Sequence, residues 1–284
     1  MAAKPRIAIV GPGRLGTALA VALSRAGYPI AEIISRESTA SRKQARSLAK
    51  RVRSRATVVD DPRSDADLFW FCVPDRSIAA VARQLSQSMK WRGKIAFHAS
   101  GALASDELIV LRRLGAAVAS VHPLMTFVGG SIPALAGVPF ALEGDQQALR
   151  QARWIARSLK APVFTIRKRD KPAYHAWGAF TSPLLVAALV TMESVARAAG
   201  LAAADARNKM LPIARQTIKN YDQLGPAGAF SGPLVRGDVE TVRQHLRVLK
   251  KVPGATEVYR ALAQAALFYL PVGERKKMKR LLSR

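Results

Sequence analysis

The sequence predicts an α/β fold, in which a doubly wound parallel sheet is followed by an all-α domain. Short apolar runs alternate with helical segments as far as residue 167, and this alternation is typical of a parallel sheet covered by helices. From residue 168 onward the strand-like runs stop and only helical segments follow. We therefore expect two domains, residues 1–167 and residues 168–284.

In the first domain, a glycine turn at residues 11–16 opens a helix through Ala26, and a basic helix runs from Ser41 to about Arg53. Further helices are expected at residues 75–89, 106–114 and 146–159. Strands are expected, in chain order, at residues 7–10, 30–34, 57–59, 68–73, 94–97, 117–121, 140–142 and 163–166.

In the second domain, helices are expected at residues 171–199, 203–221, 239–249 and 255–269, with a basic tail from Gly273. Gly225-Pro226 and Gly232-Pro233 break the chain between helices. The longest apolar stretch, residues 176–192, contains Ser182 and Pro183 and falls short of a membrane span, so it is expected to be a buried core helix.

The composition is that of a globular protein, with 49% hydrophobic and 23% charged residues. Cys72 is the single cysteine, and no Cys/His cluster has zinc-ligand spacing, so neither a disulfide nor a metal site is expected. The apolar run at residues 7–10 is too short for a signal peptide. A reducing cytoplasmic location is the expectation.

The net charge of +26 comes from 45 Lys and Arg against 19 Asp and Glu. Basic residues concentrate at 42–55 and 275–284. Such a field attracts phosphate-bearing ligands and polyanions. The alternative is a solvated basic surface. A nucleic-acid-associated protein is a further hypothesis, but interleaved aromatic residues that would stack on bases are absent from both clusters.

A glycine motif follows the first predicted strand and opens the first helix. Gly11 permits a tight turn, Gly13 lets the backbone approach a pyrophosphate, and Gly16 lets helix and strand pack closely. Arg14 and Leu15 complete the loop, whose free N–H groups and positive helix dipole suit phosphates. The order of strand, G-x-G-x-x-G and helix predicts a Rossmann domain that binds a dinucleotide.

The second strand ends in Ser35-Arg36-Glu37-Ser38, whereas an NAD enzyme usually places an acid at this strand end. Ser35, Arg36 and Ser38, with Arg42 as a further candidate, suit a 2′-phosphate, so NADP is the expected cofactor and NAD the weaker alternative. The alternative for Arg36 is an ordinary exposed arginine.

Three later strands also end in motifs on the expected ligand side of the sheet. Val73 and Pro74 begin the first motif and are assigned to the cofactor. His98 and Ser100 form the second, and His122 begins the third. Histidines there can transfer protons near neutral pH, although each could instead cap its loop.

The helical half opens with Lys171, and His175, Gly178 and Ser182 recur at helical spacing, so the four are expected to share one helix face. Pro183 is expected to kink the helix at Ser182. The polar residues on this face are candidates to meet a ligand; the alternative is a solvated face.

The ordered set of motifs resembles the Rossmann-like proteins that carry a C-terminal domain of unknown function 2520. These are relatives of the 6-phosphogluconate dehydrogenase and pyrroline-carboxylate reductase type. The motifs are the glycine loop, Val73-Pro74-Asp75, His98-Ala99-Ser100-Gly101, His122-Pro123-Leu124, Lys171 with Tyr174-His175, Ser231-Gly232-Pro233 with Arg236-Gly237-Asp238, and His245.

The resemblance implies a two-domain reductase whose nicotinamide faces the cleft between the halves, and a homodimer formed through the helical domains. Some relatives are thought to reduce ketopantoate. The family usually has Asn where this chain has Pro183, so the resemblance also leaves room for a sensor or a changed substrate.

The leading hypothesis is an NADP-dependent reductase of a small, anionic carbonyl or imine compound. Lys171 would polarise the carbonyl or protonate the alkoxide, with His175 as the alternative acid. Ser100 and His122 would orient the substrate, and His98 is a further catalytic candidate. Tyr174, Ser182 and Arg236 are the substrate-binding candidates, with Arg236 pairing with a carboxylate. The alternative hypothesis is a non-catalytic NADP-binding module.

Overall fold

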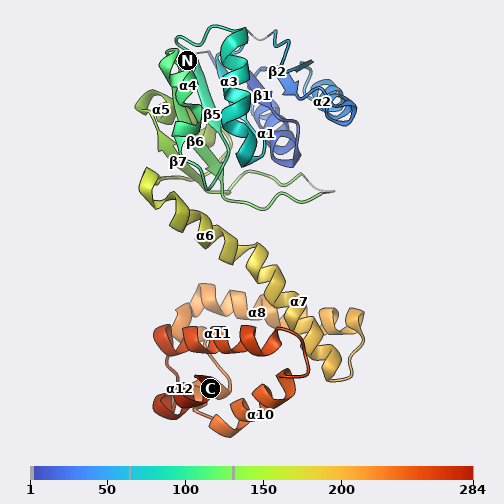
Figure 1. Ribbon diagram of the computed structural model, residues 1–284, viewed down its shortest axis with the longest axis vertical. Helices are drawn as coiled ribbons and strands as arrows, with labels where there is room; N and C mark the ends of the chain where they lie inside the picture. The colour runs from blue at the N-terminus through green and yellow to red at the C-terminus, as the bar shows by residue number, and fades with distance from the viewer. Residues whose placement is uncertain (1–2, 64, 130–131, 284) are drawn as a thin grey trace. The chain divides into compact units, whose positions relative to one another are not determined.

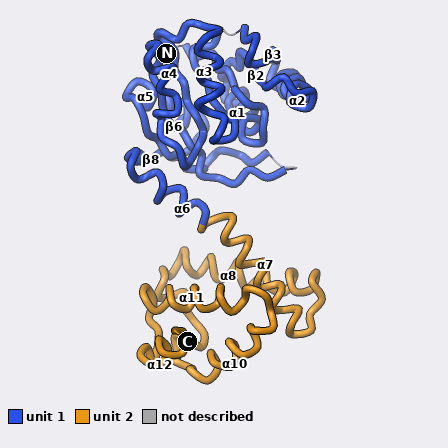
Figure 2. Tube along the Cα trace, viewed as in Figure 1, with its two compact units in different colours: residues 1–179 blue, residues 180–284 orange. Residues whose placement is uncertain are grey.

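The computed structural model describes residues 3–63, 65–129 and 132–283, and the chain forms two compact units, residues 1–179 and 180–284 (Figures 1 and 2). The sequence pattern changes earlier, at residues 167–168. Helix α6 (Lys171–Thr181) follows that change, and its first turns belong to the first unit, where Lys171 and Tyr174 are buried.

Within the described residues, eight strands form one sheet in the order β3-β2-β1-β4-β5-β6-β7-β8. The doubly wound order around β1 confirms the predicted Rossmann architecture. The strands are β1 (Ile7–Val10), β2 (Ile30–Ser35), β3 (Arg55–Val58), β4 (Leu68–Phe71), β5 (Ile95–His98), β6 (Ala117–Pro123), β7 (Phe140–Gly144) and β8 (Val163–Thr165).

Helices cover both faces of the sheet, which is why β1, β2 and β4 are buried at every residue. One core cluster joins the sheet to α1 (Arg14–Arg25), α2 (Thr39–Arg51) and α5 (Gln146–Ser158). The cluster on the other face involves α3 (Ile78–Ser88) and α4 (Ile109–Arg113), which follow the short 3₁₀ turns Asp75–Ser77 and Ser105–Leu108.

Strand β7 corrects the expectation of an all-parallel sheet, because it pairs antiparallel with β6. A parallel pairing requires a crossover connection, usually a helix. The described part of the segment between β6 and β7 forms no helix and includes Pro133 and Pro139, so the chain returns beside β6 in the opposite direction. Strand β8 then pairs parallel with β7.

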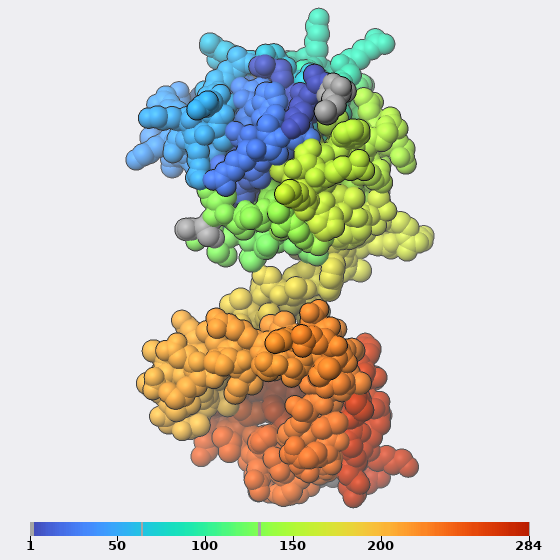
Figure 3. All heavy atoms as spheres, turned by 180° about the vertical axis from the view of Figure 1, so that it is seen from behind, coloured from blue at the N-terminus to red at the C-terminus, as the bar shows by residue number. Residues whose placement is uncertain are grey.

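The second unit is helical, as predicted. Its helices are α7 (Pro183–Ala198), α8 (Ala203–Ala229), the single turn α9 (Pro233–Arg236), α10 (Val239–Leu249), α11 (Ala255–Tyr269) and α12 (Arg275–Leu282). The core of this unit centres on Val242, Leu246 and Met278. Figure 3 shows its surface from behind, where it is hollowed between orange and red segments.

Two of the predicted breaks occur where expected. Helix α6 ends at Thr181 and α7 begins at Pro183, with Ser182 in a non-helical conformation between them. Helix α8 continues past Tyr221 but is kinked at Gly225, where φ is 69°. The basic tail is itself a helix, α12, because Met278 and Leu282 are buried against the unit.

The apolar stretch at residues 176–192 was expected to be a buried core helix, and this expectation is wrong for the single chain. Helix α7 has no fully buried residue among those described, and Phe180 and Val186 are 71% and 57% exposed. Of the described residues, only the helical stretch Lys168–Ala198 is long and apolar enough to cross a membrane by length and composition. The apolar side chains of α7 are therefore available to a partner.

Candidate active site

The glycine loop between β1 and α1 has the geometry that the sequence predicts. Gly11 has φ 101°, and a Cβ atom there would lie 2.9 Å from the Cys72 carbonyl oxygen. A Cβ atom at Gly16 would lie 2.0 Å from the Gly11 carbonyl oxygen. A Cβ atom at Gly13, by contrast, would meet nothing within 4 Å. Gly11 and Gly16 are thus needed for packing, whereas Gly13 keeps the loop open on the side from which a ligand can approach.

Polar residues after β2 form a small hydrogen-bonded cluster. Ser38 caps α2, and its hydroxyl accepts from the Ser41 N–H and donates to the Ser41 hydroxyl. Arg36 Nε donates to Ser41 Oγ at 2.9 Å, which fixes the guanidinium through one nitrogen. Within the described residues, its two terminal nitrogens make no hydrogen bond or ion pair. Ser41 was not identified as a site residue from the sequence.

Ser35, in contrast, is 1% exposed, and its hydroxyl donates to the carbonyl oxygens of Arg36 and Thr57. Its side chain is therefore directed along β2 and β3. The sequence grouped it with Arg36 because the two are adjacent, but the structure gives the two side chains different surroundings.

Asp75 and Ser100 join the ends of β4 and β5. Ser100 Oγ donates to Asp75 Oδ2 at 2.8 Å and accepts from the N–H groups of Ala102 and Leu103. The hydroxyl thus holds the loop after β5, next to the Val73-Pro74 segment from which Asp75 follows. Asp75 belongs to a motif seen in the sequence, but no role was predicted for it.

Lys171 is the central residue of the site. Its side chain is 1% exposed, and Nζ donates to Ser120 Oγ at 2.6 Å and to the Ser100 carbonyl oxygen at 3.2 Å. Burial lowers the pKa of Lys171 to about 8, although the negative charges of Glu143 and Asp75 oppose this shift. An ammonium group has three N–H donors, so one remains beyond these two contacts.

A second pair joins the same helix turn to strand β6. Tyr174 OH is 2.6 Å from His122 Nδ1. Burial raises the pKa of Tyr174 to about 12, and burial together with the positive charge of Lys171 lowers the pKa of His122 to about 4. The tyrosine therefore keeps its proton and donates to a neutral imidazole. Gly101 makes room for this ring, since a Cβ atom there would lie 3.0 Å from it.

His98 lies inside the fold. It is fully buried, its Nδ1 accepts from the Ser100 N–H, and its Nε2 is 2.9 Å from the Ala104 carbonyl oxygen. Burial lowers the pKa of His98 to about 4, which favours the neutral ring that these two bonds require. This geometry favours the alternative reading of His98 as a residue that holds its loop.

The predicted helix face requires a correction. Lys171 and Tyr174 are buried. Gly178 lies near Leu124, since a Cβ atom at Gly178 would be 3.8 Å from Leu124 Cδ1. His175 is exposed. The spacing +3 and +7 from Lys171 thus defines the face that meets the sheet, because a helix turn of 3.6 residues allows either +3 or +4 on one face.

Ser182 and Arg236 belong to the second unit. Ser182 is the residue before α7, and the structure shows no side-chain hydrogen bond that caps that helix. Arg236 donates through Nε to Asp238 Oδ2 at 2.9 Å, so the carboxylate nearest to it is its own neighbour in the chain.

Ser120 is the residue of the cluster that sequence reasoning missed. It is fully buried in β6, accepts from Lys171 and donates to the Ser100 carbonyl oxygen at 3.1 Å. A signal was present, because Ser120 is two residues before His122 on a predicted strand and therefore lies on the same face. Glu143, in the neighbouring β7, gave no comparable signal.

Two family models match the chain. The model of a Rossmann-like domain matches residues 1–123, and the model of the domain of unknown function 2520 matches residues 138–266. The second match begins in the sheet, near β7, and extends into α11. No curated protein matches the chain.

Solved structures resemble the chain over nearly its whole length. A proposed NADP oxidoreductase from Bacteroides fragilis is 22% identical, with a TM-score of 0.76 over 92% of this chain and 97% of its own. A reductive aminase from Aspergillus terreus, solved with NADPH and ethyl-5-oxohexanoate, is 15% identical, with a TM-score of 0.67 over 98% and 99%. An imine reductase from Myxococcus stipitatus, solved with NADP+, is 15% identical, with a TM-score of 0.67 over 98% and 100%. At these identities the likeness establishes a shared fold.

The sheet order, the glycine loop and the helical second unit place the chain in the Rossmann-like class. Within that class, the two family matches show that it is a Rossmann-like protein with a domain of unknown function 2520. The family expected from the ordered motifs is confirmed.

Proposed function

We propose that the protein is an NADP-dependent reductase of a small carbonyl or imine compound. The observation that carries the proposal is the buried Lys171 amino group at the carboxyl edge of the sheet, held between the Ser100 carbonyl just after β5 and Ser120 of β6, which pairs with the last residue of β5. Ligands of open α/β sheets bind outside this edge. Solved proteins of the same fold that are named as reductases of this kind support the proposal.

The glycine loop fits a dinucleotide. Gly13 leaves open space where a pyrophosphate would approach, and the N-terminus of α1 offers backbone N–H groups. Arg14 and Leu15 contribute to that turn, and Val73 and Pro74 border it from the end of β4. Arg36, tethered by Ser41, is the proposed contact for the 2′-phosphate that distinguishes NADP from NAD.

The cofactor, when bound, supplies hydride. Lys171 then acts as the charged donor. Its remaining N–H donates a hydrogen bond to the carbonyl oxygen, which becomes negatively charged during reduction, or to the imine nitrogen, which must be protonated. With a pKa near 8, the ammonium is the main form at neutral pH and can still give up its proton. Tyr174 and His122 form a neutral pair beside it that can orient the substrate.

The exposed apolar side chains of α7 support a homodimer through the helical unit. Val186 and Val190 are 57% and 54% exposed, and exposed apolar patches of this kind mark interaction surfaces. A cytoplasmic location and an anionic substrate remain part of the proposal.

Turnover of a panel of 2-oxo acids, ketones and cyclic imines with NADPH tests the function. Lys171→Met is expected to leave NADPH affinity within a few-fold and to reduce turnover by about two orders of magnitude or more, because its contact acts in the transition state. Lys43→Met, which removes an exposed lysine of α2, is the control. Near-parental turnover in Lys171→Met would refute the role of Lys171. Tight NADPH binding without turnover of any substrate would favour the non-catalytic NADP-binding module.

A further inference from the structure

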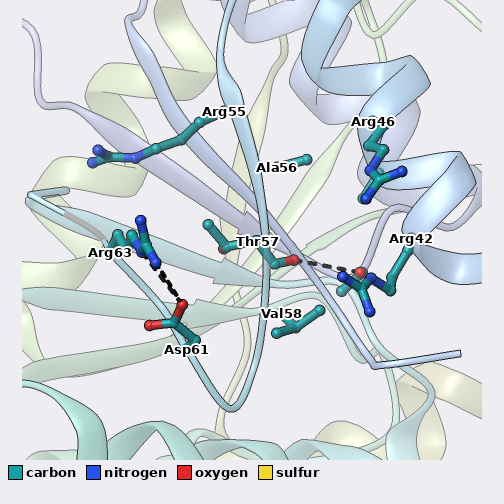
Figure 4. Close-up of a pocket in the computed structure, with 10 residues that line it drawn as sticks. Arg42, Arg46, Arg55, Ala56, Thr57, Val58, Asp61 and Arg63 are labelled. Atoms are coloured by element: carbon teal, nitrogen blue, oxygen red, sulfur yellow. Dashed lines mark hydrogen bonds and ion pairs between the residues drawn. The ribbon is translucent and has the colours of Figure 1, made fainter.

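A basic pocket of about 310 Å³ lies at the free edge of the sheet, around strand β3 (Figure 4). Four arginines line it. Arg42 and Arg46 come from α2 on one side of the strand, and Arg55 and Arg63 lie on the other side (Figure 4). Asp61 is the one acid among the lining residues that the structure describes, so the lining carries a net charge of +3 from four arginines and one aspartate.

The two pairs of arginines differ in how they are neutralised. Arg55 Nη2 is 2.9 Å from Asp65 Oδ1, and Arg63 Nη2 is 3.0 Å from Asp61 Oδ2. Among the described residues, Arg42 and Arg46 have no ion pair. They lie one helix turn apart, and like charges at this spacing destabilise a helix. Nothing within α2 offsets this cost, because the helix contains no acidic residue.

The floor of the pocket offers uncommitted polar groups. Thr57 Oγ1 is enclosed and has no hydrogen-bond partner in the described part of the chain. The Ser35 hydroxyl is buried, and its proton is already donated to backbone carbonyls, so it adds no donor for a ligand. The Val59 N–H donates to the Ser35 carbonyl, and strand alternation therefore turns the Ala56 N–H toward the free edge.

We propose that this pocket binds a phosphoryl dianion. Guanidinium groups on two sides, a backbone N–H and the Thr57 hydroxyl together suit an ion with several acceptor oxygens and about two negative charges. The test below distinguishes two sources of the phosphoryl group: a separate phosphorylated small molecule, or the 2′-phosphate of NADP, which would then contact these arginines and not Arg36. The proposal goes beyond the reductase site, because within the described residues no member of the Lys171 cluster lines this pocket.

The competing explanation is that the arginines only protect an edge strand from pairing with another chain. Calorimetric titration with inorganic phosphate at fixed ionic strength separates the two. Arg42→Gln/Arg46→Gln removes the two unpaired guanidiniums, and Arg150→Gln/Arg153→Gln removes the same charge from α5, which covers the other end of the sheet. Thermal unfolding by circular dichroism verifies that both variants are folded.

The proposal predicts at least a tenfold loss of phosphate affinity in the Arg42/Arg46 variant and a change within twofold in the α5 variant. Equal affinities in the parent and the Arg42/Arg46 variant would overturn it, as would an equal loss in both variants.

Repeating the phosphate titration on the parent with saturating NADH and then with saturating NADPH identifies the source. If phosphate binds in the presence of NADH but not NADPH, the 2′-phosphate occupies the pocket. If it binds in the presence of both, a separate phosphorylated molecule is the ligand. Failure of both cofactors to bind would refute the proposed function. The phosphate titration without cofactor would still show whether the pocket binds a phosphoryl group.

Discussion

The buried charge of Lys171 should be measurable as a pH-dependent stability. The pKa of Lys171 falls from its ordinary value of 10.5 to about 8 in the folded protein, mainly because the ammonium is buried. Between these values the unfolded chain binds the proton and the folded chain does not, so the free energy of unfolding rises with pH across this window. One pH unit corresponds to about 1.4 kcal/mol, which gives a rise of about 3 kcal/mol from Lys171 alone.

Lys171→Met removes this dependence. Below about pH 8 the parent holds a charged ammonium between Ser120 and the Ser100 carbonyl, and the variant does not. The stability of the parent relative to the variant is therefore expected to increase by about 3 kcal/mol between pH 7.5 and pH 10.5. The buried ammonium thus lowers the free energy of unfolding at neutral pH, and it provides an acid with a pKa near neutrality at the site.

Urea unfolding followed by tryptophan fluorescence is the assay. All four tryptophans lie in the first unit, and Trp70 and Trp91 are buried in its core, so the signal reports the unit that contains Lys171. Lys43→Met is the control, because Lys43 is exposed on α2. Parallel stability profiles for the parent and Lys171→Met across this pH range would refute the reasoning.

Three further results are expected. Arg36→Ala should reduce the preference for NADPH over NADH by about one to two orders of magnitude in fluorescence titrations, since a charge-assisted phosphate contact contributes about 1.5–3 kcal/mol; equal affinity of the parent for both cofactors would contradict this. Tyr174→Phe should lower the unfolding free energy by about 1 kcal/mol through loss of the bond to His122 and reduce turnover at least tenfold, whereas unchanged turnover would limit the pair to a structural role. Val186→Glu on α7 should shift the mass measured by light scattering from dimer to monomer, and a parent that is already monomeric would contradict the proposed dimer.

The fold was predictable because its signals are local. Each buried strand of the sheet centre is a continuous apolar run, as a strand covered on both faces must be. The direction of β7 was not predictable, because it depends on the absence of a crossover helix after β6. The exposure of α7 was not predictable either, because apolar composition alone cannot distinguish a core helix from one that meets a partner.

The site was predictable to the extent that its residues follow strand ends. His122 and Ser100 were found in this way and Lys171 from the helical spacing after it, and the structure brings Lys171 to Ser100 and to the vicinity of His122. Ser120 was missed because a small polar residue within a strand resembles sheet filler, and the choice between Tyr174 and His175 depends on a helix rotation that the sequence spacing leaves open.

Binding of NADPH to the parent and to Gly13→Val tests the central claim most directly. The extra side chain meets nothing within 4 Å in the protein, so the variant should fold normally, as judged by circular dichroism. It would fill the space through which a pyrophosphate approaches the loop. Calorimetry is expected to show NADPH binding to the parent and none to the folded variant. If the parent binds no NADPH, or if Gly13→Val binds it equally well, the account is contradicted.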